Sequence, residues 1–328
     1  MIYKCRNCSG NMVFMPEKQQ MYCPYCDSVD SQEMLPGENM HTCTMCGASI
    51  PVGTYDSAGK CPACSQYVIF DERISGEYEP KKIQPFMVGK DIAKKCIRQE
   101  FGDHMYMPDS FLEEVSLQKI EGVYVPFWLY NFEGNFDFEG TGTKTVTHTI
   151  GNVQNIETSY YQAKRNFDVS FTRMPQDASE AMPNDVMDLM EPYDYSTLKD
   201  FDPKYMSGFL AEIYCKDATI FEPRAAEKAK SAAEELLKES LYGYSGTTAN
   251  VKNLTITGQS NEYALLPVWR YLYQYRGKEY PYYINGQTGK VVGEVPVSPI
   301  KRVTYPLTVF FLLCFGSFMI LYILGGIL

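Results

Sequence analysis

Residues 5–26 read CRNCSGNMVFMPEKQQMYCPYC, and residues 43–64 repeat the same cysteine spacing as CTMCGASIPVGTYDSAGKCPAC. In each stretch, two Cys-x-x-Cys pairs are separated by 14 residues. Two thiolates that are two residues apart reach one ion from a single tight turn, and two such turns supply the four sulfurs that structural zinc requires. The sequence therefore predicts two zinc ribbons, over residues 1–32 and 40–70, with one structural Zn²⁺ in each. The predicted ligands are Cys5, Cys8, Cys23 and Cys26 in the first ribbon and Cys43, Cys46, Cys61 and Cys64 in the second.

The residues around the cysteines favour zinc over other uses of paired thiols. Gly10 and Gly47 follow a pair, where the turn needs a residue that tolerates positive φ, and Pro24 and Pro62 lie inside the second pair of each set. Disulfides would suit an oxidising compartment, but we find no signal peptide, and a thioredoxin-like site needs one such pair rather than four. A ribbon of this size cannot bury a core, so we expect the metal to hold it together. The other cysteines are expected to be plain apolar residues: Cys96, Cys215 and Cys314.

The opposite end of the chain is apolar. Residues 305–328 contain no charged side chain, and a helix of this length spans the ~30 Å hydrocarbon layer of a bilayer. We therefore predict one transmembrane helix over 305–328, which makes the chain a single-pass protein of the cell membrane. Lys301 and Arg302 precede the span, so the positive-inside tendency predicts that the N-terminal bulk is cytoplasmic.

Charge limits the partners of the ribbons. The whole chain has a formal net charge of −10, and residues 1–70 carry four Lys or Arg against six Asp or Glu. Phosphate contacts require a cationic face, so this balance argues against a nucleic-acid partner. An anionic body is also repelled by an anionic leaflet, and attachment to the membrane therefore depends on the terminal helix.

Between the two ends, hydrophobic patterning predicts an α+β body with antiparallel sheets, preceded by a polar linker over 71–88. In its first helix we expect Ile92, Cys96 and Ile97 to face the core. The predicted helices cover 89–101, 108–115, 184–190, 203–214 and 222–241, the last opening at Glu222-Pro223. The predicted strands cover 122–130, 136–149 after a turn near 133–135, 153–171, 249–257, 263–275 and 278–284.

A second repeat lies within this body. Val125-Pro-Phe-Trp128 resembles Leu266-Pro-Val-Trp269, and these motifs contain both tryptophans of the chain. We therefore predict two α+β halves of similar design, over 89–200 and 201–300, with each Trp as a core anchor. The alternative is an aromatic platform that binds a ligand. A proline two residues before each Trp indicates an edge position or a bulge.

The sequence contains no recognisable catalytic motif. It lacks a Gly-rich phosphate loop, a Gly-x-Ser-x-Gly turn and a His-Glu-x-x-His helix. Glu133, Asp137 and Glu139 alternate along a predicted strand and read as a solvated face rather than a site. We therefore expect that the protein is not an enzyme.

The order of the motifs resembles a group of bacterial membrane proteins, mainly from Firmicutes. After the cysteines, the resemblance rests on GVYVPFW (122–128), EPYDY (191–195), FLAEIY (209–214, expected as a helix), EPR (222–224), LLPVW (265–269) and NGQTGK (285–290). Members are often labelled transcription-factor-type zinc-ribbon proteins, or after the primosomal helicase, and some are similar to components encoded beside flotillin-like (SPFH) proteins of envelope-stress systems. The resemblance implies two zinc ions on the eight paired cysteines and a membrane-bound adaptor. Helicase activity is rejected, because the chain has no nucleotide-binding loop.

These observations lead to one expected function and two alternatives. The first is a membrane-anchored zinc-ribbon scaffold that docks cytoplasmic or membrane-associated proteins, with flotillin-like proteins among the candidate partners and envelope stress as a setting. The second is a nucleic-acid-binding zinc-ribbon protein tethered to the membrane. The third is an enzyme with an unrecognised site in the α+β body. The expected architecture is α+β: two N-terminal ribbons, a duplicated helix-plus-sheet body and one C-terminal transmembrane helix.

Overall fold

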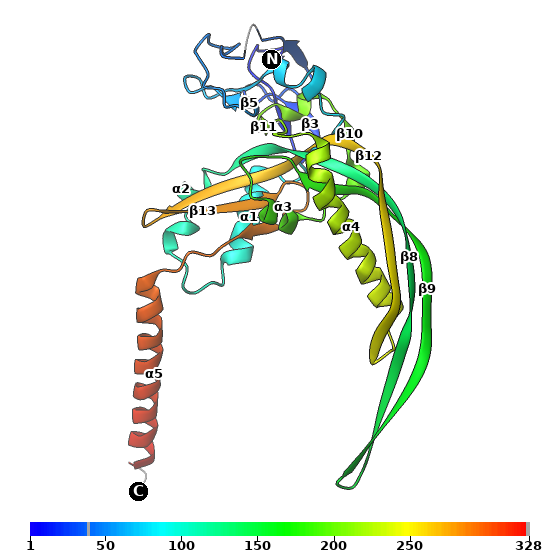
Figure 1. The fold of residues 1–328 in the computed structure, drawn as a ribbon. Coiled ribbons are helices and arrows are strands. Elements are labelled where there is room, and N and C mark those ends of the chain that lie inside the picture. The colour runs from blue at the N-terminus through cyan, green and yellow to red at the C-terminus, as the bar shows by residue number, and fades with distance from the viewer. Residues whose placement is uncertain (38–39, 326–328) are drawn as a thin grey trace.

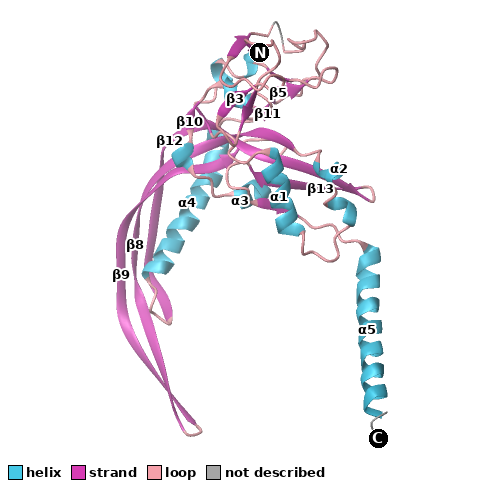
Figure 2. Cartoon of the chain, turned by 180° about the vertical axis from the view of Figure 1, so that it is seen from behind, coloured by secondary structure: helices cyan, strands magenta, loops and turns pink. Residues whose placement is uncertain are grey.

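The computed structural model describes residues 1–37 and 40–325 and has three parts (Figure 1). A head near the N-terminus contains the cysteine-rich residues, and a sheet-rich body follows it. Two limbs extend from the body in the same direction: a single helix at the C-terminus and a long, curved β arm. The view from behind shows the same arrangement (Figure 2). This mixed α+β architecture, with its sheet-rich body and one apolar C-terminal helix, confirms the predicted fold class.

The helices and strands divide between the head and the body in chain order. The head contains β1 (Ile2–Cys5), β2 (Val13–Met15), β3 (Gln20–Tyr22), β4 (Gln32–Leu35), β5 (Asp56–Lys60) and β6 (Tyr67–Ile69). The first part of the body contains β7 (Lys82–Ile83), α1 (Lys90–Phe101), α2 (Glu114–Leu117), β8 (Glu121–Ile150), β9 (Val153–Asp177) and α3 (Asn184–Met190). The rest contains β10 (Lys199–Asp200), β11 (Leu210–Glu212), α4 (Ala218–Ser240), β12 (Gly246–Tyr275), β13 (Lys278–Asn285), β14 (Val291–Gly293) and α5 (Pro299–Gly325).

One ten-stranded sheet joins the head to the body. Its main path runs β10-β7-β12-β8-β11-β5-β6, with β9 added on β8 and the β13–β14 pair added on β12. The predicted linker 71–88 contributes β7 to this sheet and buries Phe86 completely. The strands of the two predicted halves, 89–200 and 201–300, pair directly with each other through β8 and β12.

The two copies of the tryptophan motif face each other across that pairing. Val125 lies opposite Leu266, and these are the first residues of the two motifs. Pro126 lies opposite Leu265 and Tyr124 lies opposite Pro267, so the register is reciprocal about this pair. A local two-fold axis therefore passes between β8 and β12, as in an isologous dimer interface.

The outer neighbours of the two strands obey the same symmetry. β8 pairs with the parallel strand β11 up to Tyr124 and with the antiparallel strand β9 from Phe127 onward. β12 pairs with the parallel strand β7 up to Leu265 and with the antiparallel strand β13 from Val268 onward. The two motif prolines, Pro126 and Pro267, fall in these gaps. Each occupies a local edge, where the missing N–H breaks no ladder, as the sequence predicted.

The halves exchange their first segments. Trp128 Nε1 donates to the Lys216 carbonyl at 3.2 Å, just before α4, and Trp269 Nε1 donates to the Val88 carbonyl at 2.8 Å, just before α1. Each helix-bearing segment therefore docks on the long strand of the other half. Trp269 is buried, as predicted for a core anchor, whereas Trp128 is partly buried against the same core.

Strands that the sequence divides are continuous in the structure. The turn predicted near 133–135 is wrong, because β8 passes through it and pairs on both sides, with β9 and with β12. The irregularity is a register shift between Tyr130 and Phe132 on the β9 side and between Gly258 and Ser260 on the β12 side. Gly134 is required here, because a Cβ would lie 2.1 Å from the Thr255 carbonyl oxygen. A bulge and a close backbone approach thus replace the expected turn.

The helix predicted over 203–214 is also wrong. Pro203–Met206 forms one 3-10 turn, and Leu210–Glu212 forms β11. β11 lies between β8 and β5, so pairing on both edges overrides the local helical pattern. Only the structure reveals this strand as the link between head and body.

The other predicted helices are present with changed limits. α1 matches its prediction, but Ile92 is exposed, and the buried face contains Ala93, Ile97 and Phe101. The helix predicted over 108–115 is a 3-10 turn followed by α2. α4 begins at Ala218 rather than Glu222, with Pro223 inside it, and so starts two residues after Lys216. α1 likewise starts two residues after Val88, so the docking of the symmetric segment determines both starts.

The β arm is a three-stranded ribbon backed by one helix. α4 lies along the concave side of β8, β9 and β12 (Figure 1). Its alanines, Ala225, Ala229 and Ala233, let the helix approach the large rings of Phe132 and Phe136. The small alanine side chains and the large rings thus pack into two continuous buried clusters between helix and sheet.

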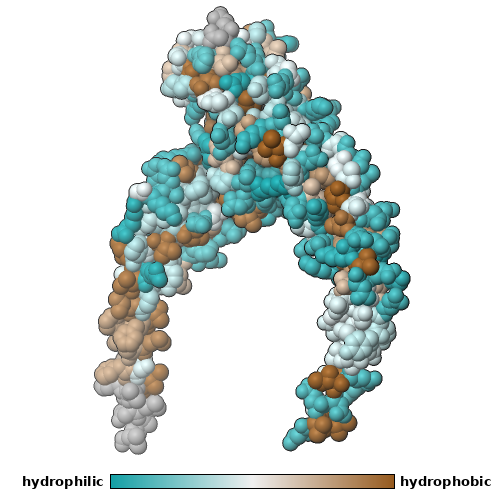
Figure 3. All heavy atoms as spheres, viewed as in Figure 1, coloured by the Kyte–Doolittle hydropathy of each residue, from teal (hydrophilic) through white to brown (hydrophobic). Residues whose placement is uncertain are grey.

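The C-terminal helix has no polar face. Within Pro299–Ile320 of α5, the most apolar stretch of 18 residues has a mean hydropathy of 1.9, and none of it is buried against the rest of the protein. Its exposed surface is almost wholly apolar (Figure 3). The helix is therefore long and apolar enough to cross a membrane.

The local two-fold axis relates a buried carboxyl group in one half to a buried amide at the equivalent position in the other half. Asp177 lies opposite Phe127 on β8, and Asn285 lies opposite Val268 on β12, at equivalent positions. Asn285 donates to the Met190 carbonyl at 3.0 Å. Burial raises the pKa of Asp177 to about 6, although the nearby Arg224 opposes the shift.

We expect Asp177→Asn to fold normally and to flatten the pH dependence of stability. A carboxyl group whose pKa is higher in the folded state binds its proton more tightly in that state. The free energy of unfolding therefore falls as the pH rises from the ordinary pKa of an aspartate to the folded-state pKa of about 6. Wild-type protein should lose about 1 kcal/mol of unfolding free energy between about pH 5 and about pH 7 from this group. Chemical unfolding of both proteins in mild detergent tests this, because other pH effects cancel in the difference. Parallel pH curves would contradict the expectation.

Candidate metal centres

All four Cys-x-x-Cys turns share one backbone pattern. The amide of the first cysteine donates to the carbonyl five residues later, as from Cys5 to Gly10 at 2.8 Å. The amide four residues after that cysteine donates back to its carbonyl, as from Ser9 to Cys5 at 2.8 Å. The residue after the second cysteine has positive φ in every turn. These residues are Ser9 (60°), Asp27 (58°), Gly47 (71°) and Ser65 (60°).

One local prediction therefore needs correction. Gly47 has the expected positive φ, but in the first turn that conformation belongs to Ser9 rather than Gly10. Gly10 is needed for space, because a Cβ there would lie 2.5 Å from the ring of Tyr25. A serine accepts the left-handed conformation when the two hydrogen bonds of the turn hold it there.

The turns bring the eight predicted cysteines into two groups of four. Within each group, all four sulfurs lie within 4.8 Å of one another. The Sγ–Sγ distances are 3.6 Å for Cys5–Cys26, 3.5 Å for Cys8–Cys23, and 3.7 Å for both Cys43–Cys64 and Cys46–Cys61. A tetrahedron with Zn–S bonds of ~2.3 Å has edges of roughly 3.8 Å, whereas a disulfide needs ~2.05 Å. The geometry fits zinc and confirms the prediction of two structural zinc ions.

Local hydrogen bonds prepare the sulfurs for a cation. The Ser28 hydroxyl, 3.1 Å from Cys26 Sγ, and the Ser28 amide lower the pKa of Cys26 to about 6. The backbone amide of Cys64 is the largest cause that lowers the pKa of Cys61, to about 7. Each group thus contains at least one thiol whose pKa is lowered, and a bound metal supplies the positive charge that stabilises four thiolates together.

The two sites are closed to catalysis but lie at the surface. The buried cysteines are Cys5, Cys23, Cys43 and Cys61, each the first residue of its pair. The second cysteines are exposed or half-buried: Cys8, Cys26, Cys46 and Cys64. Four thiolates complete the tetrahedron around each zinc and leave no position for water or substrate. The sites therefore stabilise structure. The other cysteines, Cys96, Cys215 and Cys314, lie outside both groups, as expected.

Both ribbons are joined firmly to the body. In the first ribbon, the Phe14 amide donates to the Ser207 carbonyl at 2.9 Å, and Ser207 Oγ donates to the Met12 carbonyl at 2.6 Å. In the second ribbon, β5 pairs with β11, with Ala58 opposite Ala211. The sequence placed the ribbons but contained no signal for these contacts, because they join segments more than 150 residues apart.

An apolar cleft lies where the first ribbon meets the body. Its volume is about 400 Å³, and its wall combines ribbon and body residues. Its apolar lining includes Phe14 and Met15 from the ribbon and Phe209 and Trp269 from the body, and its charged lining residues are Glu17, Lys90 and Asp91. No pattern in the sequence predicts this cleft, because its walls come from six stretches of chain that lie apart in the sequence.

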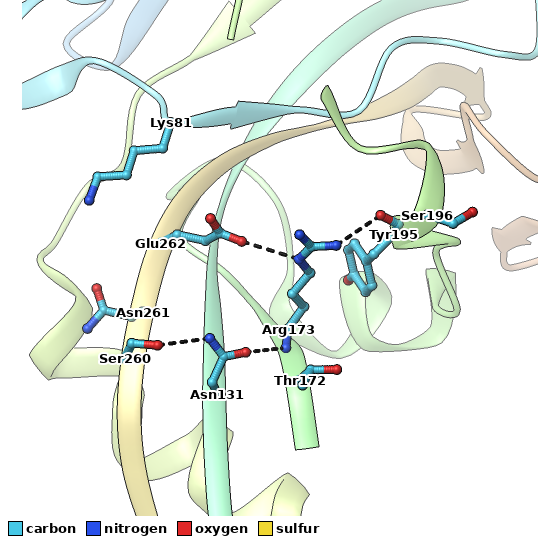
Figure 4. A pocket seen from close by; sticks show the side chains of 9 residues that line it. All are labelled: Lys81, Asn131, Thr172, Arg173, Tyr195, Ser196, Ser260, Asn261 and Glu262. Atoms are coloured by element: carbon cyan, nitrogen blue, oxygen red, sulfur yellow. Dashed lines mark hydrogen bonds and ion pairs between the residues drawn. The ribbon is translucent and has the colours of Figure 1, made fainter. Parts of the chain in front are cut away.

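A polar hollow of about 640 Å³ lies at the bulges of the β arm (Figure 4). Arg173 Nε contacts Glu262 at 3.3 Å, and its guanidinium also donates to the Tyr195 carbonyl at 3.0 Å. Asn131 accepts from the Arg173 amide at 2.9 Å and donates to the Ser260 hydroxyl at 2.8 Å. These groups satisfy one another and hold the two register shifts in place.

Two of the three acids on the strand face predicted on β8 have partners on β9. Lys164 pairs with Glu139 at 2.5 Å, and Asn166 donates to Asp137 at 3.4 Å. Glu133 is exposed and lines an open hollow beside Asp168. The three acids point to the strand surface, as the sequence indicated.

Fold and sites together define a double zinc-ribbon protein with one C-terminal helix suited to a membrane. The uncharacterized protein YdjG of Bacillus subtilis (strain 168) is 31% identical over 308 residues, which cover 90% of each chain. The chain belongs to the family of that protein. No protein-family model matches the chain, and no solved structure matches it.

Removing one ligand should distinguish the two metal centres. Cys23 belongs to the main core that includes body residues, whereas Cys61 belongs to a separate core of the second ribbon. We expect Cys23→Ser and Cys61→Ser each to lower bound zinc from about two to about one per chain. Cys23→Ser should also lower the thermal midpoint more, because it loosens the core of the body.

Metal analysis and thermal melting in detergent give both quantities. Cys96→Ser is the matched control and should keep both zinc ions, because Cys96 lies on α1 outside the two groups. Equal melting losses for the two ligand variants would show that the first ribbon does not support the body.

Proposed function

We propose that the protein is a membrane-anchored scaffold whose zinc-ribbon head docks other proteins. The observation that carries this proposal is the rigid joining of both ribbons to the body, at the end of the molecule opposite the tip of α5 (Figure 1). A head fixed in this way is displayed at a constant position relative to the membrane. Closed tetrathiolate sites fit this role, because they stiffen a recognition surface and perform no chemistry.

The head presents apolar surface that suits a protein partner. Tyr25, Val29 and Met34 are 65%, 48% and 53% exposed. The cleft of about 400 Å³ lies where the first ribbon meets the body and suits an apolar or aromatic side chain, with Trp269 in its wall. Exposed aromatic and methionine side chains beside a pocket are typical of protein-binding surfaces.

The proposed topology places the head and body in the cytoplasm, with α5 as a single-pass anchor in the cell membrane. Lys301 and Arg302 at the start of α5 support this orientation through the positive-inside tendency. Eight reduced thiolates also suit the reducing cytoplasm.

We propose membrane proteins of the flotillin-like class as partners, in an envelope-stress setting. The support is the resemblance to zinc-ribbon proteins encoded beside such proteins. Nucleic acid is the competing partner, and the acidic balance of residues 1–70 disfavours it.

Photo-crosslinking in native membranes tests the docking role. We expect a photoreactive phenylalanine at Met34, on the head, to capture a specific protein, because this side chain is exposed beside the ribbons. The same probe at Leu236, on α4, is the control, since it is 43% exposed but lies on the arm. Capture at both positions alike, or of nucleic acid at Met34, would contradict the proposal. Alkaline extraction of the membranes tests the anchor separately, and an anchored chain stays in the pellet.

A further inference from the structure

The end of the β8–β9 hairpin extends beyond the rest of the arm. β12 begins at Gly246, opposite Thr143, so β8 and β9 continue alone from there to their turn. α4 ends at Ser240 and gives this end no cover along its length (Figure 1). The turn has only two residues, and Gly151 has positive φ (63°) between Ile150 and Val153.

The hairpin end lacks the charges that normally cover a solvated ribbon. Residues 145–156 read TVTHTIGNVQNI and contain no Asp, Glu, Lys or Arg. Its four large aliphatic side chains are all at least half exposed: Val146 (50%), Ile150 (72%), Val153 (61%) and Ile156 (65%). Ile150 and Val153 are cross-strand partners and project to the same face at the tip. Figure 3 shows apolar surface at this end of the arm.

The hairpin and α5 point the same way. In two views that differ by a half-turn about the vertical, both descend from the body, and the hairpin tip reaches the level of the described end of α5 (Figures 1 and 2). Contacts at its start orient α5 relative to the body. Lys301 pairs with Asp109 at 2.6 Å, and the Ser298 amide donates to the Tyr106 carbonyl at 2.7 Å. A membrane crossed by α5 therefore meets the hairpin end.

We propose that the hairpin end, residues 145–156, is a second membrane contact that lies in the lipid headgroup layer. The proposal rests on the proposed anchoring of the chain through α5. The partner is a lipid surface, because a bilayer crossed by α5 lies next to the hairpin end, which points the same way as that helix. Exposed Val and Ile side chains that alternate with Thr, Asn, Gln and His side chains suit the boundary between lipid headgroups and acyl chains.

The backbone limits how deep the contact goes. A two-stranded ribbon leaves the outer N–H and C=O groups of both strands unpaired, and such groups are too costly to place in hydrocarbon. The charged side chains Lys144 and Glu157 bound the uncharged stretch and mark its limit. The tip lies level with the far end of α5, so α5 must cross the bilayer tilted toward the arm for the hairpin end to lie among the headgroups of the nearer leaflet.

Two contacts would hold the body as an arch over the membrane. A single helix leaves the body free to tilt and rotate about its anchor. A second contact at the end of the arm removes that freedom and keeps the zinc-ribbon head at the far side from the lipid (Figure 1). The long β arm then acts as a strut that orients the head.

Tryptophan quenching in vesicles tests the contact directly. The full-length chain is reconstituted in phosphatidylcholine and phosphatidylglycerol vesicles whose acyl chains carry bromine either near the headgroup or near the chain end. Three single variants are compared with the parent: Ile150→Trp at the tip, Phe318→Trp in α5 and Tyr242→Trp after α4, where the parent side chain is 94% exposed. We expect the fluorescence of the tryptophan in Ile150→Trp to be quenched by the brominated lipids, more strongly when the bromine is near the headgroup. Its emission maximum should also shift to the blue on reconstitution. Tyr242→Trp should not change.

The outcomes separate this inference from the anchoring on which it rests. Failure of the bromines to quench Phe318→Trp overturns the anchor. Quenching of Phe318→Trp without quenching of Ile150→Trp overturns the hairpin contact alone. A third outcome is that the tryptophan of Ile150→Trp is shielded from aqueous iodide but is not quenched by brominated lipid. A second copy of the chain would then cover the open edge of β9, and this outcome also overturns the membrane contact of the hairpin.

Discussion

The antiparallel pairing of β8 with β12, centred on Val125 and Leu266, is the interaction on which the other parts depend. It brings the two tryptophan motifs together and creates a local two-fold axis. Around that axis each half completes the other. Phe86 packs on Trp269 with ring centroids 5.0 Å apart, and Tyr214 packs on Trp128 at 5.1 Å. Neither half has a complete core without the segment that the other half supplies, so both should fold as one unit.

The same pairing supports both ends of the molecule. On one side, β11 extends the central sheet to β5 and so joins the second ribbon to the body. On the other, β8 and β12 continue past the core and become the arm. Zinc is needed because the ribbons bury too little apolar surface to fold alone. In the folded protein the second ribbon is part of the common sheet, whereas the first ribbon joins the body through hydrogen bonds to Ser207 and through the main core.

Local chemistry explains which elements were predictable. The cysteine turns were predictable, because the two ligands, the turn residue and the hydrogen bonds of each turn all lie within six residues. The helices α1 and α3 were also predictable, because the hydrophobic pattern of each is short and uninterrupted. The turn near 133–135 was not, since Gly134 and Asn135 have turn propensity that pairing on both edges of β8 overrides. β11 was missed for the same reason, and the apolar cleft was missed because six separate stretches of chain form it.

The sequence by itself determined the metal ligands, the apolar C-terminal helix and the existence of a repeat, because each depends on residues that are neighbours along the chain. Only the tertiary structure decided that the repeats exchange segments about a two-fold axis, that the second ribbon shares the sheet of the body, and that the hairpin end points the same way as α5. These features depend on strand register and on the direction of elements far apart in sequence. Register is a collective property of the paired strands, so no single segment encodes it.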